Sequence, residues 1–217
     1  DNIDINVVGS ANAAQLAMLA ADTKDANTVD VSVGISDTLD NLMRIVAGAG
    51  QPEVNFATAL ANTAAEPITV SDTFVNVEDG TASDLVKQIN KLINLANAET
   101  SSVTMTIKDA STSNLLLTTG TTITGAAAGS SIEVQLGNIT ATDALLTNLN
   151  ALGAQDGISK ITANITGMTA ARIDKLATLN DIDTSSKFEI TYTTSGEITL
   201  GQAKTLVDKT TLTTNTT

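Results

Sequence analysis

The 217-residue sequence contains no cysteine, no histidine and no tryptophan, and aromatic residues make up only 2 % of it. The missing cysteine excludes disulfides and thiolate metal sites, and the missing histidine removes the commonest catalytic base. Carboxylates, lysine, serine and Tyr192 are the catalytic groups that remain, so we expect no enzymatic activity. A core with so few large aromatic rings must be filled by many small aliphatic side chains.

Basic residues are also scarce, because 11 Lys and Arg face 24 Asp and Glu for a net charge of −13. This charge repels phosphate backbones and anionic lipid surfaces, which argues against a nucleic-acid partner. The sequence has no run of eighteen apolar residues, so we expect no membrane insertion. It begins at Asp1 without a basic and then apolar leader, which predicts a processed product or a segment of a longer chain.

What the sequence does have is a short strand pattern that recurs at nearly fixed spacing. The four copies are Val103–Ile107, Ile132–Leu136, Ile161–Ile165 and Phe188–Tyr192, and their first residues lie 29, 29 and 27 positions apart. Each copy alternates apolar residues with Thr, Glu, Gln or Asn, which is typical of a strand with one dry and one wet face. A period in this range is the mark of stacked repeats.

A glycine turn and a short helix with a polar cap follow the later strands. The predicted caps are Thr140 with Asp143, Thr169, and Thr199 with Gln202. Helical returns imply parallel pairing, since antiparallel neighbours need only a tight turn, and the alternating strands place the helices on one side of the sheet. The fold prediction is therefore an α/β repeat, a parallel β-solenoid resembling a β-helix, with one short strand per coil of about 26–29 residues.

The same unit recurs near the start of the chain, with strands at residues 3–7 and 29–33. We expect one elongated solenoid domain over residues 1–209, with an irregular coil near 48–67 and an enlarged helix at 81–97. The Thr-rich residues 210–217 are predicted to be a tail or linker. Stacked coils expose unpaired strands at their ends, so the segment 1–8 or the coil at Phe188 is predicted to contact a neighbouring copy or domain.

Three groups of acidic residues are weak candidates for a calcium site, because acidic repeat proteins often bind calcium through oxygen clusters. Calcium is accordingly the one candidate cofactor. The alternative, which the short acceptor of Asp favours, is that these carboxylates cap helices and form turns. The candidates are Asp37 with Asp40, Asp72 near Glu78 and Asp79, and Asp181 with Asp183.

Four acidic residues occupy the second position of their strands, namely Asp4, Asp30, Glu133 and Glu189. In a stack they would line one stripe that attracts cations or sugar hydroxyls. The reading that we favour is a solvated sheet face whose charges prevent sheets from aggregating.

Several segments resemble repeats in large secreted surface proteins of cyanobacteria and proteobacteria, of the S-layer-like or adhesin type. These segments are Ile139–Leu145, Gly167–Asp174 and Val70–Thr73. The resemblance implies an extracellular, cell-surface protein that is structural or adhesive, such as an S-layer, filament or adhesin subunit that self-associates. The acidic, Thr-rich, Cys-free composition agrees with an extracellular location. Alternatives are a polysaccharide-binding or polysaccharide-cleaving β-helix protein, with a surface glycan as partner, and a phage or injection-system fibre.

Overall fold

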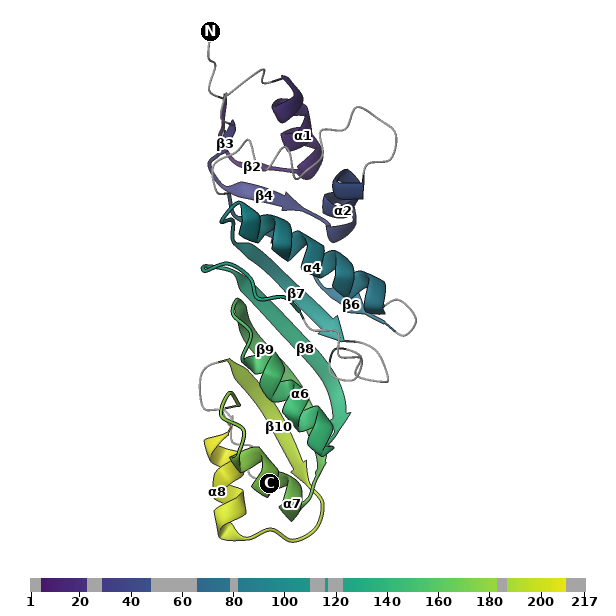
Figure 1. Cartoon of the computed structure of the whole chain (residues 1–217), viewed down its shortest axis with the longest axis vertical. Coiled ribbons are helices and arrows are strands. Elements are labelled where there is room, and N and C mark those ends of the chain that lie inside the picture. The colour runs from purple at the N-terminus through teal and green to yellow at the C-terminus, as the bar shows by residue number, and fades with distance from the viewer. Residues whose placement is uncertain are drawn as a thin grey trace. The chain divides into compact units, whose positions relative to one another are not determined.

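Strands and helices alternate along the chain in its computed structural model, which describes residues 5–22, 29–47, 66–78, 82–109, 116, 123–182 and 187–209 (Figure 1). The chain divides into two compact units. Unit 1 contains Asp1–Val75, Lys87–Thr106 and Thr124–Ser131, and unit 2 contains Asn76–Val86, Ile107–Ile123 and Ile132–Thr217. The boundary passes through β6 (Val75–Val77), α4 (Ala82–Ala98) and β7 (Val103–Asp109).

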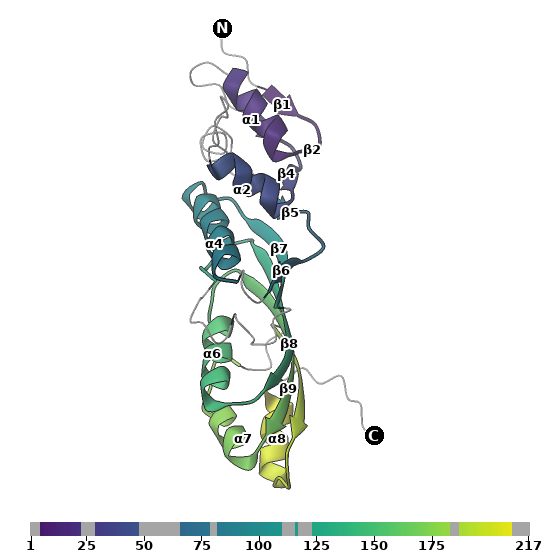
Figure 2. The same cartoon turned by 90° about the vertical axis from the view of Figure 1, so that its right-hand side faces the viewer.

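Unit 1 is built from short parallel strands and the helices that connect them. Its main sheet has the order β2 (Ser10–Ala11), β4 (Gly34–Asp37), β5 (Ile68–Val70) and the first part of β7, with every pair parallel. β1 (Ile5–Val7) and β3 (Val29–Val31) form a separate two-stranded parallel sheet. Helices α1 (Ala13–Asp22) and α2 (Leu39–Ala47) are neighbours on one side of β2 and β4 (Figure 2).

Unit 2 repeats this plan with longer strands. Its sheet has the order β8 (Ser131–Thr140), β9 (Ile158–Met168) and β10 (Phe188–Thr194), and both pairs are parallel. Helix α6 (Asp143–Gly153) connects β8 to β9, α7 (Ala170–Ala177) connects β9 to β10, and α8 (Leu200–Asp208) follows β10. Helices α6 and α7 lie on one face of the sheet, and α8 is the neighbour of α7 (Figure 2).

Threonine hydroxyls begin the helices of unit 2, as the sequence predicts, but one of the three predicted caps is wrong. The Thr169 hydroxyl accepts from Arg172 N, and Thr199 with Gln202 forms a reciprocal capping box at 3.2 and 3.0 Å. Helix α6 is capped by Thr142, whose hydroxyl accepts from Leu145 N at 3.1 Å. Thr140 is the last residue of β8, because the strand runs further than the alternation suggests.

The core of unit 2 lies between the sheet and its helices, and it is almost entirely aliphatic. The apolar positions of the strands and the stripe of each helix are buried, as the period-2 and helical spacings predict. Burial of each such side chain stabilises the fold by about 1.5–3 kcal/mol, so many small side chains can replace large aromatic ones. The fully or almost fully buried residues include Ile132, Val134, Ile161, Ile165, Leu146, Leu149, Ile173, Leu176 and Phe188.

Polar side chains reach from one strand–helix unit to the helix of an earlier one. The Lys187 ammonium donates to the carbonyls of Gly153 and Gln155, at the end of α6, at 2.6 and 2.9 Å. The Gln202 amide donates to the Ala170 carbonyl and to the Asp174 carboxylate of α7, at 3.3 and 3.0 Å. The Lys187 ammonium thereby satisfies carbonyls at the C-terminal end of α6, where a helix leaves carbonyls without an internal partner, and Gln202 joins α8 to α7.

The predicted β-solenoid is wrong. The described residues form an α/β fold in which mostly parallel sheets carry helices, and they contain no closed or coiled sheet. A solenoid stacks coils of equal size in one register, whereas the paired strands here range from 2 residues in β2 to 11 in β9. Parallel pairing and helical connections, which the sequence also predicted, are present in both units.

The fixed repeat also predicts the wrong partner for one strand. A 29-residue spacing sets Ile132 opposite Ile161, but Ile132 pairs with Ile158, and Ile161 pairs with Val134. The offset between paired residues of β8 and β9 is 26 or 27 along the whole pairing, and the irregularities, one of them between Ile132 and Glu133, change it by one residue. The 27-residue spacing is confirmed, since Phe188 pairs with Ile161.

The predicted helix at 81–97 corresponds to α4, Ala82–Ala98. Most of the predicted irregular coil near 48–67, and the whole tail 210–217, lie outside the described residues.

Candidate functional site

The face of the unit 2 sheet that is turned away from α6 and α7 is polar. Alternation places Glu133 and Gln135 of β8, Thr162 and Asn164 of β9, and Thr191 of β10 on it, all exposed or half-buried. Asn164 Nδ2 donates to Asn138 Oδ1 of the neighbouring strand at 3.2 Å, in a pair that the register sets side by side. Hydroxyl, amide and carboxylate groups therefore share one continuous surface.

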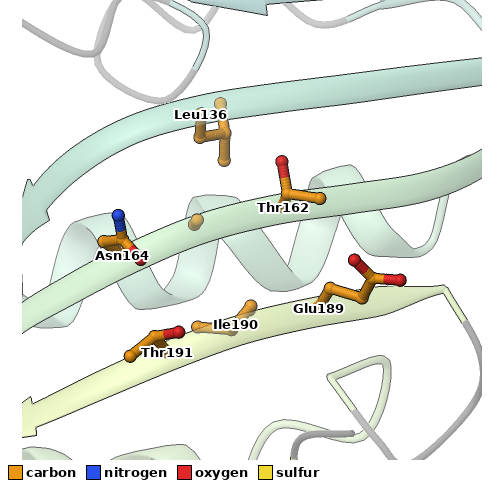
Figure 3. A pocket seen from close by; sticks show the side chains of 7 residues that line it. Leu136, Thr162, Asn164, Glu189, Ile190 and Thr191 are labelled. Atoms are coloured by element: carbon orange, nitrogen blue, oxygen red, sulfur yellow. The ribbon is translucent and has the colours of Figure 1, made fainter. Parts of the chain in front are cut away.

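A shallow hollow of about 320 Å³ lies on this polar face. Figure 3 shows Thr162 and Asn164 on β9 beside Glu189 and Thr191 on β10, with α6 behind the strands. The complete lining is Leu136, Thr162, Ala163, Asn164, Glu189, Ile190 and Thr191. The lining offers hydrogen-bonding groups on an aliphatic floor, which suits a polyhydroxylated ligand better than a flat apolar one.

One lysine sets the electrostatics of the polar face. Lys160 pairs in register with Glu133, and its Nζ lies 2.9 Å from Glu189 Oε1. The hydrogen bond to Glu189 raises the pKa of Lys160 above its ordinary value, with smaller contributions from the charges of Glu189 and Glu133. An exposed pair of this kind adds little stability, so its effect is to fix the position of the Glu189 carboxylate at the rim of the hollow.

The predicted stripe of four acids is interrupted. Lys160 lies beside Glu133 and Glu189 in unit 2, so these two carboxylates flank a cation. Asp30 lies in β3 of unit 1, and Asp4 lies outside the described residues. The exposed and half-buried polar residues of this face agree with the solvated sheet face that the sequence favoured, and the neighbouring lysine was not foreseen.

Two of the calcium candidates, Asp37 and Asp72, cap helices. Asp37 Oδ2 accepts from Ala13 N, the first residue of α1, at 3.1 Å, and Oδ1 accepts from Thr38 N at 2.8 Å. Asp72 Oδ2 accepts from Leu39 N, the first residue of α2, at 2.7 Å. A carboxylate at a helix N-terminus satisfies a free amide and interacts favourably with the helix dipole. Both acids thus perform the capping role that the sequence offered as the alternative to calcium.

We expect Asp72→Ala to destabilise unit 1 by about 1 kcal/mol, because α2 loses a charged cap from the strand beside it. Asp72→Asn should recover part of the loss, since the amide oxygen can still accept. Denaturant titration followed by circular dichroism measures both changes, and added calcium chloride should leave the wild-type midpoint unchanged. A calcium-dependent rise in the midpoint that Asp72→Ala abolishes would contradict the capping role and support a metal site.

The other calcium candidates are dispersed. Asp181 Oδ2 accepts from Asn150 Nδ2 at 2.7 Å, while Asn150 Oδ1 accepts from the Asp181 amide at 2.9 Å. Asp40 lies in the first turn of α2 and Glu78 follows β6, both exposed, and Asp79 and Asp183 lie outside the described residues. Within the residues that the structure describes, no three His, Cys, Asp or Glu side chains are grouped to hold a metal ion.

Glu66 is a buried carboxylate that the sequence did not single out. It precedes β5 in unit 1, only 6 % of it is exposed, and its Oε1 accepts from Val31 N of β3 at 3.1 Å. Burial raises the pKa of Glu66 above its ordinary value of 4.5, the hydrogen bond from Val31 lowers it, and the nearby Asp30 carboxylate raises it. The net direction is upward, so folding favours the protonated form.

This direction predicts how stability depends on pH. A raised folded-state pKa contributes stability that is present below 4.5 and is lost as the pH rises through the folded pKa. Glu66→Gln keeps an oxygen that can accept from Val31 N, and it carries no charge. The free energy of unfolding of this variant, relative to that of the wild type, should therefore grow as the pH rises from below 4.5 to neutrality. Chemical denaturation across this range measures the difference. Glu197→Gln, which makes the same charge change at an exposed position, should show no such trend, and a wild-type advantage at neutral pH would contradict the prediction.

Tyr192, the one tyrosine, occupies the inward position on β10 that the alternation predicts. Its hydroxyl is buried and has no hydrogen-bond partner, and burial raises the pKa of this hydroxyl above its ordinary value. The side chain therefore stays protonated at neutral pH. This environment suits a core residue, as the sequence favoured.

Within the residues that the structure describes, the outer side of unit 2 carries an open strand edge and exposed apolar side chains. Among the described strands β10 pairs only with β9, and α8 contains no fully buried residue although it packs against α7. Leu200 and Val207, seven residues apart on α8, are 88 % and 51 % exposed. Ala203 and Leu206, which correspond to the buried Ile173 and Leu176 of α7, are only half-buried, and Leu200 and Val207 add exposed apolar surface to this last helix.

The architecture and these surfaces define an α/β protein with mostly parallel sheets and a polar sheet face. Comparison with known proteins finds no matching family model, no matching curated protein and no matching solved structure. None of the described helices combines the length and the apolar character that crossing a membrane requires.

The sequence missed Lys160, the hollow and Glu66. Alternation did signal the polar face, but the position of the hollow depends on how β8, β9 and β10 align, and bulges shift that alignment. No local pattern distinguishes Glu66 from an exposed glutamate, because its burial comes from β3, 35 residues away in the sequence.

Proposed function

We propose that this chain is a structural or adhesive module of an extracellular, cell-surface protein and that it self-associates. The observation that carries the proposal is the uncovered outer side of unit 2, where β10 offers unpaired backbone and α8 exposes Leu200 and Val207. Exposed strand edges and apolar patches are usually shielded in monomeric proteins, so an unshielded pair of them marks an interaction surface.

Two further features support an extracellular scaffold. The sequence lacks cysteine and carries a net charge of −13, so it has no thiol to oxidise and disfavours anionic partners. Asp37 and Asp72 each cap a helix that belongs to another strand–helix repeat, and Lys187 binds a carbonyl at the end of α6. Such contacts between repeats suit a protein that forms a mechanically stable array. No described cluster of groups suggests catalysis.

Antibody labelling of intact cells that produce the chain tests the location. We expect labelling without permeabilisation and loss of the signal after brief external protease treatment. Labelling that requires permeabilised cells would overturn the extracellular assignment. Purified protein should also form species larger than a monomer at high concentration, as measured by sedimentation velocity.

The hollow favours a second candidate function, which is polysaccharide binding on the polar face. Thr162, Asn164 and Thr191 present hydroxyl and amide groups, and Glu189 presents a carboxylate held by Lys160. Such groups match the hydroxyls of a sugar chain. Cleavage is less favoured, because glycoside hydrolysis generally uses two carboxylates and Glu189 is the one carboxylate in the lining.

A glycan array followed by titration calorimetry tests this candidate. If a sugar binds in the hollow, Asn164→Ala combined with Thr191→Ala should weaken the affinity about tenfold, because two hydrogen bonds are lost. Thr193→Ala, an exposed substitution on β10 outside the hollow, should leave the affinity unchanged. Equal effects of the two variants would show that binding lies elsewhere.

A further inference from the structure

We propose that copies of this chain join head to tail, with the α1 and β2 side of one copy docked on the outer side of α8 and β10 of the next. This inference rests on the proposed self-association and names the two surfaces that meet. Its starting point is that β10 and β2 each have a single partner among the described strands, β9 and β4 respectively. They are the two end strands of the order β10-β9-β8-β7-β5-β4-β2.

The outer faces of the two helices match in character. Helix α8 exposes Leu200 and Val207, and α1 exposes Ala14 and Met18, which lie one turn apart and of which Met18 is 63 % exposed. Among the described helices, α8 packs mainly against α7 and α1 packs mainly against α2, and both retain exposed side chains. Docking α1 beside α8 would cover both apolar surfaces at once.

Helix α1 also carries a glutamine, Gln15, in the same position as Gln202, which joins α8 to α7. Asn12 and Gln15 form a capping box at the start of α1, with reciprocal hydrogen bonds of 2.8 and 2.9 Å, just as Thr199 and Gln202 do at the start of α8. Gln202 also donates its amide to Ala170, the first residue of α7. By the same geometry, the exposed Gln15 of a second copy would donate to the carbonyl of Leu200, the first residue of α8.

These matches favour a second copy over an unrelated partner, because the chain itself contains a strand and capped helix of the kind that covers β9 and α7. The two surfaces are different, so the contact is heterologous, and a series of copies that does not close into a ring keeps one open surface at each end. The expected product is a linear series of oligomers that lengthens with concentration.

Blocking each surface separately tests the inference with the full chain. The double variant Leu200→Glu with Val207→Glu blocks α8, and Ala14→Glu with Met18→Glu blocks α1. All four positions are exposed, so the fold should persist, which circular dichroism verifies. By sedimentation velocity, wild type should form a ladder, each blocked variant alone should be a monomer, and an equimolar mixture should form a dimer that grows no further.

Ala144→Glu with Ala151→Glu adds the same charge to exposed positions of α6 and should retain the wild-type ladder. Because the chain lacks cysteine, Met18→Cys in one copy and Leu200→Cys in another should form a disulfide under mild oxidation, while two Leu200→Cys copies should not. A dimer of the α1-blocked variant alone would show α8 meeting α8 and overturn the inference. A wild-type monomer at every concentration would also overturn it, whereas cell-surface labelling would still test the proposed location independently.

Discussion

Gly34→Ala should destabilise unit 1 by roughly 3 kcal/mol or more, because it combines backbone strain with a clash. Gly34 begins β4 with a φ of 95°, a conformation that residues with a Cβ rarely adopt. A Cβ at this position would lie 2.4 Å from the Pro67 carbonyl oxygen and 2.7 Å from Pro67 Cγ. That carbonyl cannot retreat without weakening the 2.8 Å hydrogen bond that it accepts from Ile35 N, which joins β4 to the segment leading into β5.

Gly9→Ala provides the matched control for the strain alone. Gly9 has a φ of 115°, but no atom lies within 4 Å of the position that its Cβ would occupy. The difference between the two unfolding free energies therefore measures the clash with Pro67. Chemical denaturation gives both values, and native-state hydrogen exchange at Ile35 should show the loss in β4. Equal destabilisation by the two substitutions would contradict the close approach of Pro67.

Gly153→Ala should destabilise unit 2 by about 1–3 kcal/mol, although Gly to Ala within a helix normally stabilises by up to about 1 kcal/mol. A Cβ on Gly153, the last residue of α6, would lie 2.2 Å from Cζ and 2.8 Å from Cε2 of Phe188. The Phe188 ring is fully buried, so it has little room to move. The helix and the first residue of β10 would have to separate.

A double-mutant cycle identifies the cause. Phe188→Leu alone should destabilise unit 2 by leaving a void, but it also makes room for the new methyl group, so the combined variant should be more stable than the sum of the two losses predicts by about 1 kcal/mol. Gly201→Ala, in the exposed first turn of α8, reports helix propensity without a clash, because the nearest atom lies 3.8 Å from the added Cβ. Strictly additive losses would show that Phe188 is not the obstacle.

Both predictions concern glycines whose importance depends on partners distant in the sequence. In both pairs, Gly34 with Pro67 and Gly153 with Phe188, the glycine and its neighbour lie more than thirty residues apart in the sequence. Local sequence patterns can indicate that a glycine forms a turn or ends a helix, but they do not show what packs against it. The contacts that make these glycine substitutions destabilising form only when segments distant in the sequence pack together.

The candidate site also combines features that the sequence predicts with features that only the tertiary structure sets. The polar character of the face around Thr162 and Asn164 could be predicted, because alternation along a strand places every second side chain on one side. The hollow could not, because it depends on the shifted register between β8 and β9 and on the salt bridge from Lys160 to Glu189. Likewise Asp72 was visible as a carboxylate next to a strand, but its partner, Leu39 N, lies 33 residues earlier.

The sequence by itself determined the alternating strands, the parallel pairing that helical connections require, the caps at Thr169 and Thr199, and the acidic, cysteine-free surface chemistry. These features depend on residues within a turn or two of each other, so local periodicity and capping chemistry are sufficient to predict them. The tertiary structure alone decided that the strands form open α/β sheets and not a solenoid, that Ile132 pairs with Ile158, and that Glu66 is buried. Register and burial are set by contacts between segments some thirty residues apart, where a single bulge changes the partner of every residue that follows.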